Sequence, residues 1–229
     1  MVAEASSPLV PQSRELRQAG LVLAAAFVLG GVGEVITYRG GDVSQAYLVT
    51  ESFFARFAGF LVVVLCGRSA PGPRQATAAG LILALGAYAG GAAADLLGGW
   101  PVAFGPFGLG AGDFGPGLSA ALILPPVGVL LAFLTRRVDF RGDLALAVLL
   151  QAQLIPAVSS LLYLFSREGG ECCVAVEWGH PWQDWAGLAL ALSLTVLLRP
   201  TPAARLRSFA AMAVLAASLI GVGRLQGFL

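Results

Sequence analysis

Seven long apolar runs limit what this chain can fold into more than any other feature of its sequence. A helix needs about 20 predominantly apolar residues to cross the hydrocarbon core of a bilayer. The residues are 57% hydrophobic and only 12% charged, whereas soluble domains carry about 25% charged residues. The sequence therefore predicts an all-α, polytopic helical membrane protein. The expected transmembrane helices lie near residues 18–38, 48–66, 76–98, 118–135, 144–165, 183–198 and 208–225.

The distribution of arginines predicts the number of spans and their orientation. With seven spans, ten arginines fall on one side of the membrane and three on the other. If the short sixth run did not cross, the division would be eight against five. Because cytoplasmic loops are enriched in Lys and Arg, seven spans with a cytoplasmic N-terminus fit better than six. The ten are Arg14, Arg17, Arg68, Arg74, Arg136, Arg137, Arg141, Arg199, Arg205 and Arg207, and the three are Arg39, Arg167 and Arg224.

Outside these spans, the sequence consists of an N-terminal tail and the loops that connect the helices. Residues 1–17 form a polar N-terminal tail, and residues 18–229 form a single transmembrane domain with outer loops at 99–117 and 166–182. The chain contains neither lysine nor asparagine, which excludes a Schiff base on lysine and indicates a GC-rich, prokaryotic genome. We therefore expect the protein in the plasma (inner) membrane, crossing it several times.

Two of the apolar runs resemble each other. Both "GLVLAAAFVLGGVGE", from Gly20, and "GLILALGAYAGGAAAD", from Gly80, become rich in Gly and Ala before an acidic residue. Small residues at such spacings let neighbouring helices approach closely. Shared packing demands explain the likeness without an internal duplication.

Charged and amide side chains inside the expected spans indicate a first candidate site. Glu34, Glu51 and Asp95 lie near the outer ends of their runs, Arg56 lies deeper in the second, and Gln151 lies near the middle of the fifth. Ionisable groups in a bilayer face the protein interior and pair with one another. These residues are candidates for a transport path, and an ion-pair network that only holds helices together is the structural alternative.

The outer stretch "ECCVAVEWGHPWQDW" is a second candidate site. Cys172, Cys173 and His180 could bind a soft metal or undergo redox chemistry, since thiolates and imidazole suit Cu(I) or Zn. The spacing matches no standard zinc pattern. Tryptophans are favoured at a membrane–water interface, so an interfacial loop is the alternative. The aromatic residues that would then lie at the boundary, or dock a partner, are Trp178, Trp182 and Trp185.

Three functions follow from these patterns. The first is a transport-type protein that moves a cation, a proton or a small polar solute. The second is a non-catalytic accessory subunit of a larger membrane complex that docks an extracytoplasmic or membrane protein partner. The third, a membrane enzyme using the outer cysteines and His180, is the least expected. No basic face with interleaved aromatics indicates nucleic acid, the bilayer is the expected environment, no catalytic residue is assigned, and the sequence identifies no cofactor.

Overall fold

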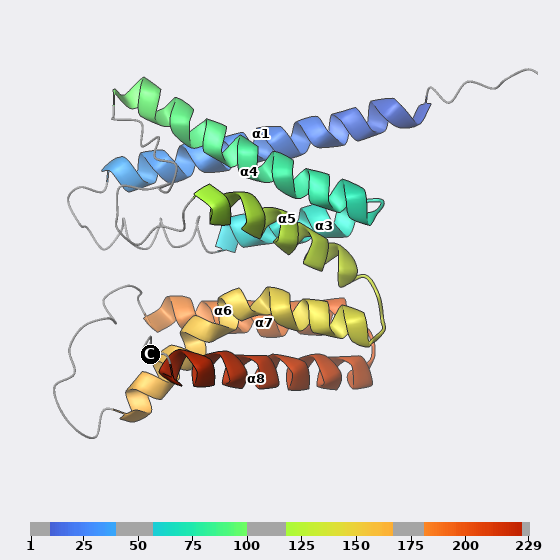
Figure 1. Ribbon diagram of the computed structural model, residues 1–229, viewed down its shortest axis with the longest axis vertical. Coiled ribbons are helices and arrows are strands. Elements are labelled where there is room, and N and C mark those ends of the chain that lie inside the picture. Colours follow the sequence, from blue (N-terminus) through green and yellow to red (C-terminus); the bar gives the residue numbers. More distant parts are fainter. Residues whose placement is uncertain (1–9, 40–56, 100–117, 167–180, 226–229) are drawn as a thin grey trace, which may run out of the picture.

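A computed structural model describes residues 10–39, 57–99, 118–166 and 181–225, and within these ranges the fold is helical with no strand. The expected all-α fold is therefore confirmed for the described part of the chain. It contains seven helices, drawn in Figure 1: α1 (Val10–Arg39), α3 (Gly59–Ser69), α4 (Pro73–Gly98), α5 (Leu118–Leu134), α6 (Phe140–Ser166), α7 (Pro181–Leu198) and α8 (Pro202–Leu225).

Three helical segments in the described ranges are long and apolar enough to cross a membrane: Pro73–Gly98, Phe140–Val158 and Pro202–Val222. These segments support the prediction of a transmembrane helical protein. The other described apolar helical segments are shorter, and they are Arg17–Val32, Gly59–Ser69, Ile123–Leu134 and Gln183–Leu198.

The helix bounds follow the apolar runs closely from α4 to α8, and differ at the N-terminal end. α1 begins at Val10, so the last residues of the segment expected as a polar tail are helical. Of the second expected run, 48–66, the part before residue 57 lies outside the described residues. The expected outer loops at 99–117 and 166–182 also lie almost entirely outside them.

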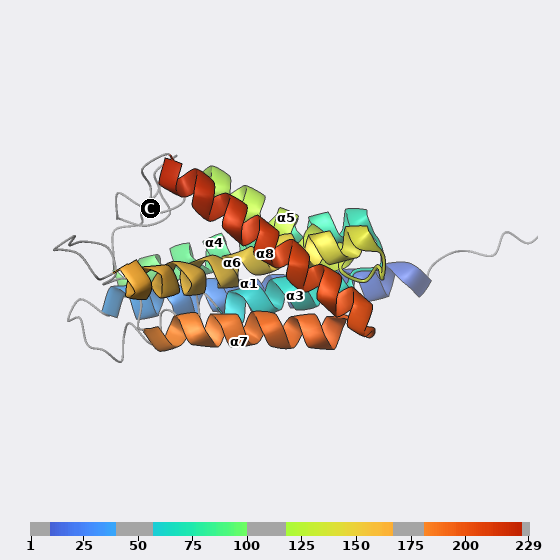
Figure 2. The same cartoon turned by 90° about the horizontal axis from the view of Figure 1, so that it is seen from below.

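The helices form two halves that meet along α5 and α6. α1, α3, α4 and α5 pack together in one half, and α6 packs on α7 and α8 in the other (Figure 1). Seen from below, α8 crosses α6 obliquely, and α7 runs alongside α6 (Figure 2). Val64, Ala132 and Leu149 form a buried cluster that joins the halves. The second half is centred on Leu146, Leu150 and their neighbours, so α6 is its core helix.

Small residues bring α1 and α4 into direct backbone contact. A Cβ atom on Gly30 would collide with the backbone carbonyl of Ala87, and one on Gly90 would collide with that of Phe27. Gly86 lies against Ala26 in the same interface. The two Gly/Ala-rich segments noted in the sequence therefore pack on each other, side by side and in the same direction (Figure 1).

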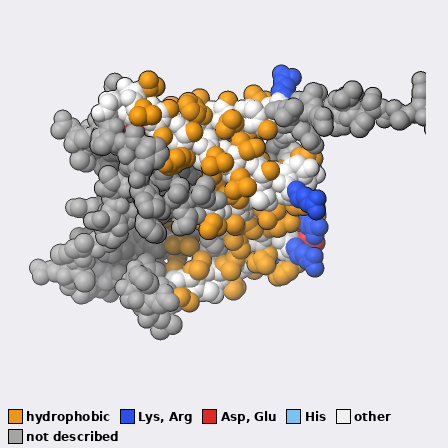
Figure 3. Space-filling model, turned by 45° about the horizontal axis from the view of Figure 1, so that its top comes forward, with side chains coloured by type: hydrophobic (Ala, Val, Ile, Leu, Met, Phe, Trp, Pro, Cys, Tyr) orange, Lys and Arg blue, Asp and Glu red, His pale blue; other side chains and the backbone are white. Residues whose placement is uncertain are grey.

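The chain reverses at each connection, so one end of the bundle collects the arginines. α3, α5 and α7 end there, and α1, α4, α6 and α8 begin there (Figure 1). We call this the basic end, defined by Arg17, Arg68, Arg74, Arg136, Arg137, Arg141, Arg199, Arg205 and Arg207. Figure 3 shows arginine side chains at this end of the displayed face, beside a broad hydrophobic surface.

Candidate functional site

A buried carboxylate at the basic end organises the second half of the bundle. Asp143 lies in the first turn of α6, which the carboxylate of Asp139 caps by accepting a hydrogen bond from the Gly142 amide at 2.9 Å. The Asp143 and Arg199 side chains are both fully buried, and Nε of Arg199 lies 2.8 Å from Oδ1 of Asp143. The helix start thus carries a negative charge where its positive dipole end favours one.

Two more residues complete what we call the Asp143 network: Asp143, Arg199, Arg207 and Ser208. Nε of Arg207, whose side chain is 47% exposed, lies 2.7 Å from Oδ2 of Asp143. The Ser208 hydroxyl donates to Oδ1 of Asp143 at 3.2 Å and accepts from Nε of Arg199 at 3.3 Å. Each carboxylate oxygen is therefore satisfied, and the network ties together α6, the end of α7 and the start of α8.

Arg199 also extends the network to the end of α5. Its Nη1 donates to the backbone carbonyls of Thr135 at 2.8 Å and Arg137 at 3.0 Å. The last carbonyls of a helix have no partner within that helix, and a cation there also interacts favourably with the helix dipole. A single guanidinium thus joins the ends of α5 and α7 to the beginnings of α6 and α8.

Other arginines cap the remaining helix ends in the same way. Nη1 of Arg136 donates to the carbonyl of Ala70, directly after α3, at 2.6 Å. Nε of Arg205 donates to the carbonyl of Arg199, directly after α7, at 2.8 Å. Nη1 of Arg68 donates to the Thr135 hydroxyl at 3.2 Å. All three helices that end at the basic end therefore have carbonyls capped by arginine.

Burial dominates the electrostatics of this network. It lowers the pKa of the Arg199 guanidinium, and the neighbouring Asp143 carboxylate opposes that shift. Arginine is the most basic side chain and is effectively always protonated in proteins, so Arg199 carries a positive charge. Its Nη2 is buried without a hydrogen-bond partner among the described residues, so one donor of a fully buried cation remains open.

A second buried polar group lies deeper in the same half, and we call it the Gln151 layer: Gln151, Thr195 and Met212. Nε2 of Gln151 donates to the carbonyls of Ala147 and Met212, each at 3.2 Å. The Thr195 hydroxyl donates to the carbonyl of Ala191 at 2.8 Å and lies 3.9 Å from the sulfur of Met212. Gln151 is eight residues beyond Asp143 on α6, which corresponds to about 12 Å along the helix.

The orientation of the Gln151 amide follows from its partners. Both neighbours are carbonyl oxygens, which only accept, so the amide nitrogen must face them. Oε1 then points the other way, and it is buried without a hydrogen-bond partner among the described residues. The layer therefore presents one open acceptor beside the apolar cluster of this half.

The structure separates the described members of the first predicted site. Asp95 is buried near the end of α4, with Oδ1 unpartnered among the described residues. Gln151 is buried in α6, in the other half of the bundle. Glu34 lies in α1, one helical turn after Gly30. Glu51 and Arg56 lie outside the described residues.

The second predicted site falls almost entirely outside the described chain. Cys172, Cys173, Trp178 and His180 are not among the described residues, and of Trp182 only the backbone in α7 is described. Trp185 is 49% exposed. Within the described ranges, no three His, Cys, Asp or Glu side chains come together as metal ligands would.

No family model, curated protein or solved structure matches this chain.

The Asp143 network is the feature that sequence reasoning missed. From the sequence alone, we interpret the arginines only as markers of the cytoplasmic side. Two signals in the sequence indicate that some of them also pair with Asp143. Asp143 is an acid among the arginines of the basic end, and only three residues, 199–201, separate α7 from α8. Such a short connection brings Arg199 and Ser208 close together.

Proposed function

We propose that this is a small transport-type membrane protein that moves a cation, a proton or a small polar solute. It lies in the plasma membrane of a prokaryotic cell and crosses it seven times, with its N-terminus and the basic end in the cytoplasm. The observation that carries the proposal is the fully buried Asp143–Arg199 pair. The open acceptor of Gln151, on the same helix as Asp143, also supports it.

The cost of the buried pair supports a role beyond packing. Desolvating two charges costs several kcal/mol per ion in proteins, and apolar residues of similar volume often stabilise as well or better. Ionisable groups in membrane helices also mark solute pathways in many proteins. The Asp143 network joins the three helix ends of the second half at the basic end to the end of α5, so separating Arg199 from Asp143 is the step that would open it. We assign the network the role of a closed inner gate.

The Gln151 layer supplies a polar position behind that gate. Oε1 of Gln151 is an acceptor with no donor among the described residues, so it favours a cation or a solute that carries N–H or O–H groups. The Thr195 hydroxyl and the Met212 sulfur, 3.9 Å apart, belong to the same layer. The neighbouring Leu150, Leu154 and Ala191 are apolar. A cation or hydrogen-bond donor that enters this layer would therefore bind at Oε1 of Gln151 rather than at these side chains.

Flux into proteoliposomes tests the proposal. Proton uptake would be followed with trapped pyranine, rubidium and sodium uptake with radiotracers, and glycerol uptake by light scattering. We expect at least one of these fluxes to exceed that of protein-free vesicles. Gln151→Met should lower that flux about fivefold, because a hydrogen bond worth about 1 kcal/mol is lost. Arg207→Gln should raise it up to about fivefold, since an exposed ion pair contributes 0–1 kcal/mol to the closed gate.

The matched control is Gln153→Met, which removes a second buried Oε1 without a hydrogen-bond partner among the described residues, two residues along α6 and outside the Gln151 layer. Its flux should equal that of the unchanged protein. If no probe enters faster than into empty vesicles, or if Gln151→Met and Gln153→Met have equal flux, the transport proposal is wrong. A stoichiometric companion retained on purification from native membranes would then favour the accessory subunit.

A further inference from the structure

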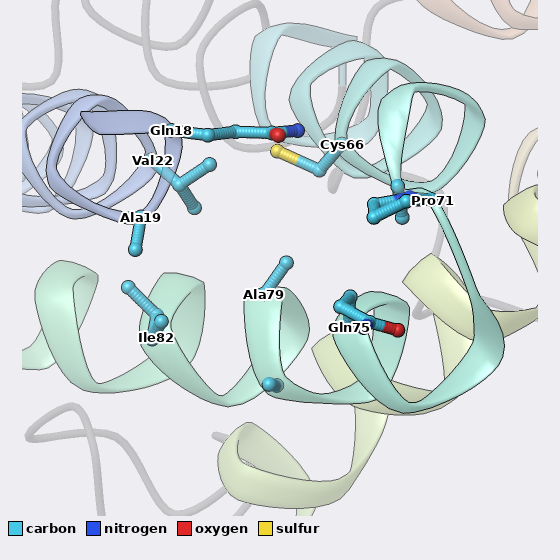
Figure 4. A pocket seen from close by; sticks show the side chains of 10 residues that line it. Gln18, Ala19, Val22, Cys66, Pro71, Gln75, Ala79 and Ile82 are labelled. Carbon is cyan, nitrogen blue, oxygen red and sulfur yellow. The ribbon is translucent and has the colours of Figure 1, made fainter. Parts of the chain in front are cut away.

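A cavity of about 160 Å³ opens between α1, α3 and α4 near the basic end. Its lining is mostly apolar and includes Val22, Ala79 and Ile82. Figure 4 shows the side chains of Gln18 and Cys66 converging on one side of it, with Ala79 and Ile82 of α4 opposite. The lining residues Gln75 and Ala78 are exposed, so the cavity is accessible from the surface of the bundle.

The size and lining of the cavity suit hydrocarbon. An engineered apolar cavity of about 150 Å³ in another protein stays dry and binds benzene. The cavity here is similar in volume, and of its ten lining residues only Gln18, Gln75 and Cys66 carry polar side-chain atoms. It lies where the apolar segment Arg17–Val32 begins, at the depth where a lipid's acyl chains start.

The rim of the cavity is positively charged. Exposed Arg17 precedes Gln18 on α1, and exposed Arg74 precedes Gln75 on α4. α4 begins at Pro73 after Gly72, without a side-chain cap. The Ala76 amide donates to the Gly72 carbonyl, so the amides of Arg74 and Gln75, together with the helix dipole, also favour an anion there. Arg68 and Arg136, by contrast, already donate to the protein, to Thr135 and Ala70. A phosphate at the rim would therefore bind to Arg17 and Arg74 without displacing an existing hydrogen bond of Arg68 or Arg136.

We infer that this cavity binds an anionic phospholipid of the inner leaflet, with part of an acyl chain in the cavity and the phosphate at Arg17, Arg74 and the start of α4. Basic pockets between transmembrane helices on the cytoplasmic side are suited to anionic headgroups. The inference is independent of transport, because the cavity lies in the other half of the bundle from the Gln151 layer.

Cys66 supplies a built-in reporter, since its side chain lines the cavity. In a full-length Cys172→Ser/Cys173→Ser protein it is the single cysteine left. Alkylation by N-ethylmaleimide would be timed in detergent micelles during titration with phosphatidylglycerol or phosphatidylcholine. Each arginine near an anionic headgroup is worth about fivefold in affinity, so phosphatidylglycerol should protect Cys66 at a concentration about 25-fold lower than phosphatidylcholine.

Two variants test the binding of the lipid's acyl chain and of its headgroup separately. Arg17→Gln/Arg74→Gln should abolish the preference for phosphatidylglycerol, whereas Arg141→Gln, an exposed arginine at the basic end of the other half, should retain it. Ala78→Phe should fill the cavity and make alkylation independent of lipid. Ala89→Phe is its matched control, because Ala89 is exposed on nearly the same side of α4, three turns further along.

Native mass spectrometry gives a readout that does not depend on thiol reactivity. The unchanged protein should retain one phosphatidylglycerol, and Arg17→Gln/Arg74→Gln should lose it. Equal protection and equal retention of the two lipids would overturn the inference. Protection of Cys66 by inorganic phosphate alone would also overturn it, since that result would assign a free anion rather than a lipid.

Discussion

Arg199 and Arg207 offer a controlled comparison of buried and exposed ion pairing. Both donate from Nε to the same Asp143 carboxylate, at 2.8 and 2.7 Å. They differ in environment, because the Arg199 side chain is fully buried and the Arg207 side chain is 47% exposed. Replacing each by methionine removes one charge from one shared partner while keeping a long, unbranched side chain.

The structure sets the expected magnitudes. Removing one member of a buried ion pair costs about 3–5 kcal/mol, because the other charge is left uncompensated. Arg199→Met also uncaps the carbonyls of Thr135 and Arg137, so we expect a loss in the upper part of that range. Removing an exposed partner costs about 0–1 kcal/mol, and after Arg207→Met the Asp143 carboxylate keeps Arg199 and Ser208.

The assay is reversible unfolding in mixed micelles, titrated with dodecyl sulfate and followed by circular dichroism. A difference of about 3 kcal/mol between the two variants corresponds to more than a hundredfold in the unfolding equilibrium, since 1.4 kcal/mol is tenfold. Arg199→Met combined with Asp143→Asn should lose less stability than the sum of the single changes. Equal losses for Arg199→Met and Arg207→Met would refute the argument that burial, rather than pairing distance, decides the contribution.

Three further outcomes follow from the same contacts. Arg199→Lys should lower the free energy of unfolding by about 2 kcal/mol or more in the same titration, because an ammonium cannot reproduce the planar fork that reaches Asp143 and two carbonyls; stability within error of the unchanged protein would contradict this. Gly30→Ala should cost about 1–3 kcal/mol by overpacking α1 against the Ala87 carbonyl, whereas Gly20→Ala, with nothing within 4 Å, should be neutral or stabilising; an equal response at both glycines would disprove the close contact. Arg136→Gln should destabilise by about 1 kcal/mol through loss of its charged hydrogen bond to the Ala70 carbonyl, measured against Arg141→Gln as the exposed control, and equal stabilities would refute that cap.

The helices were predictable from the sequence because local signals mark their ends. The end of α4 illustrates this: the helix stops at Gly98, and Gly99 follows with a φ of 69°, a conformation that glycine adopts without strain. Similarly, 183–198 was expected from its apolar length, and α7 ends at Leu198. The start of α1 at Val10 was not expected, because the polar residues there carry no apolar periodicity.

The candidate site was less predictable, because it depends on which helices pack together. Asp95 and Gln151 were expected to share a path, yet α4 packs on α1 and α5 while α6 packs on α7 and α8. Hydropathy places residues at a depth in the membrane, and it does not say which neighbour they face. The partnership of Asp143 with Arg199 likewise requires that α7 end beside the start of α6. Gly30 and Gly90 were the exception, since small residues indicate close packing before the partner is known.

The capping of helix ends by arginine has a consequence for how the chain enters its membrane. Arg136 can reach the carbonyl of Ala70, and Arg199 that of Thr135, only if α3, α5 and α7 finish at the same end. A nascent chain with one helix left uninserted would present free carbonyls at one end and unpaired guanidinium groups at the other. The same side chains that bias insertion thus also penalise its errors afterwards. Arginine suits both tasks because it carries several donors in a fixed plane, and all 14 basic residues of this chain are arginine.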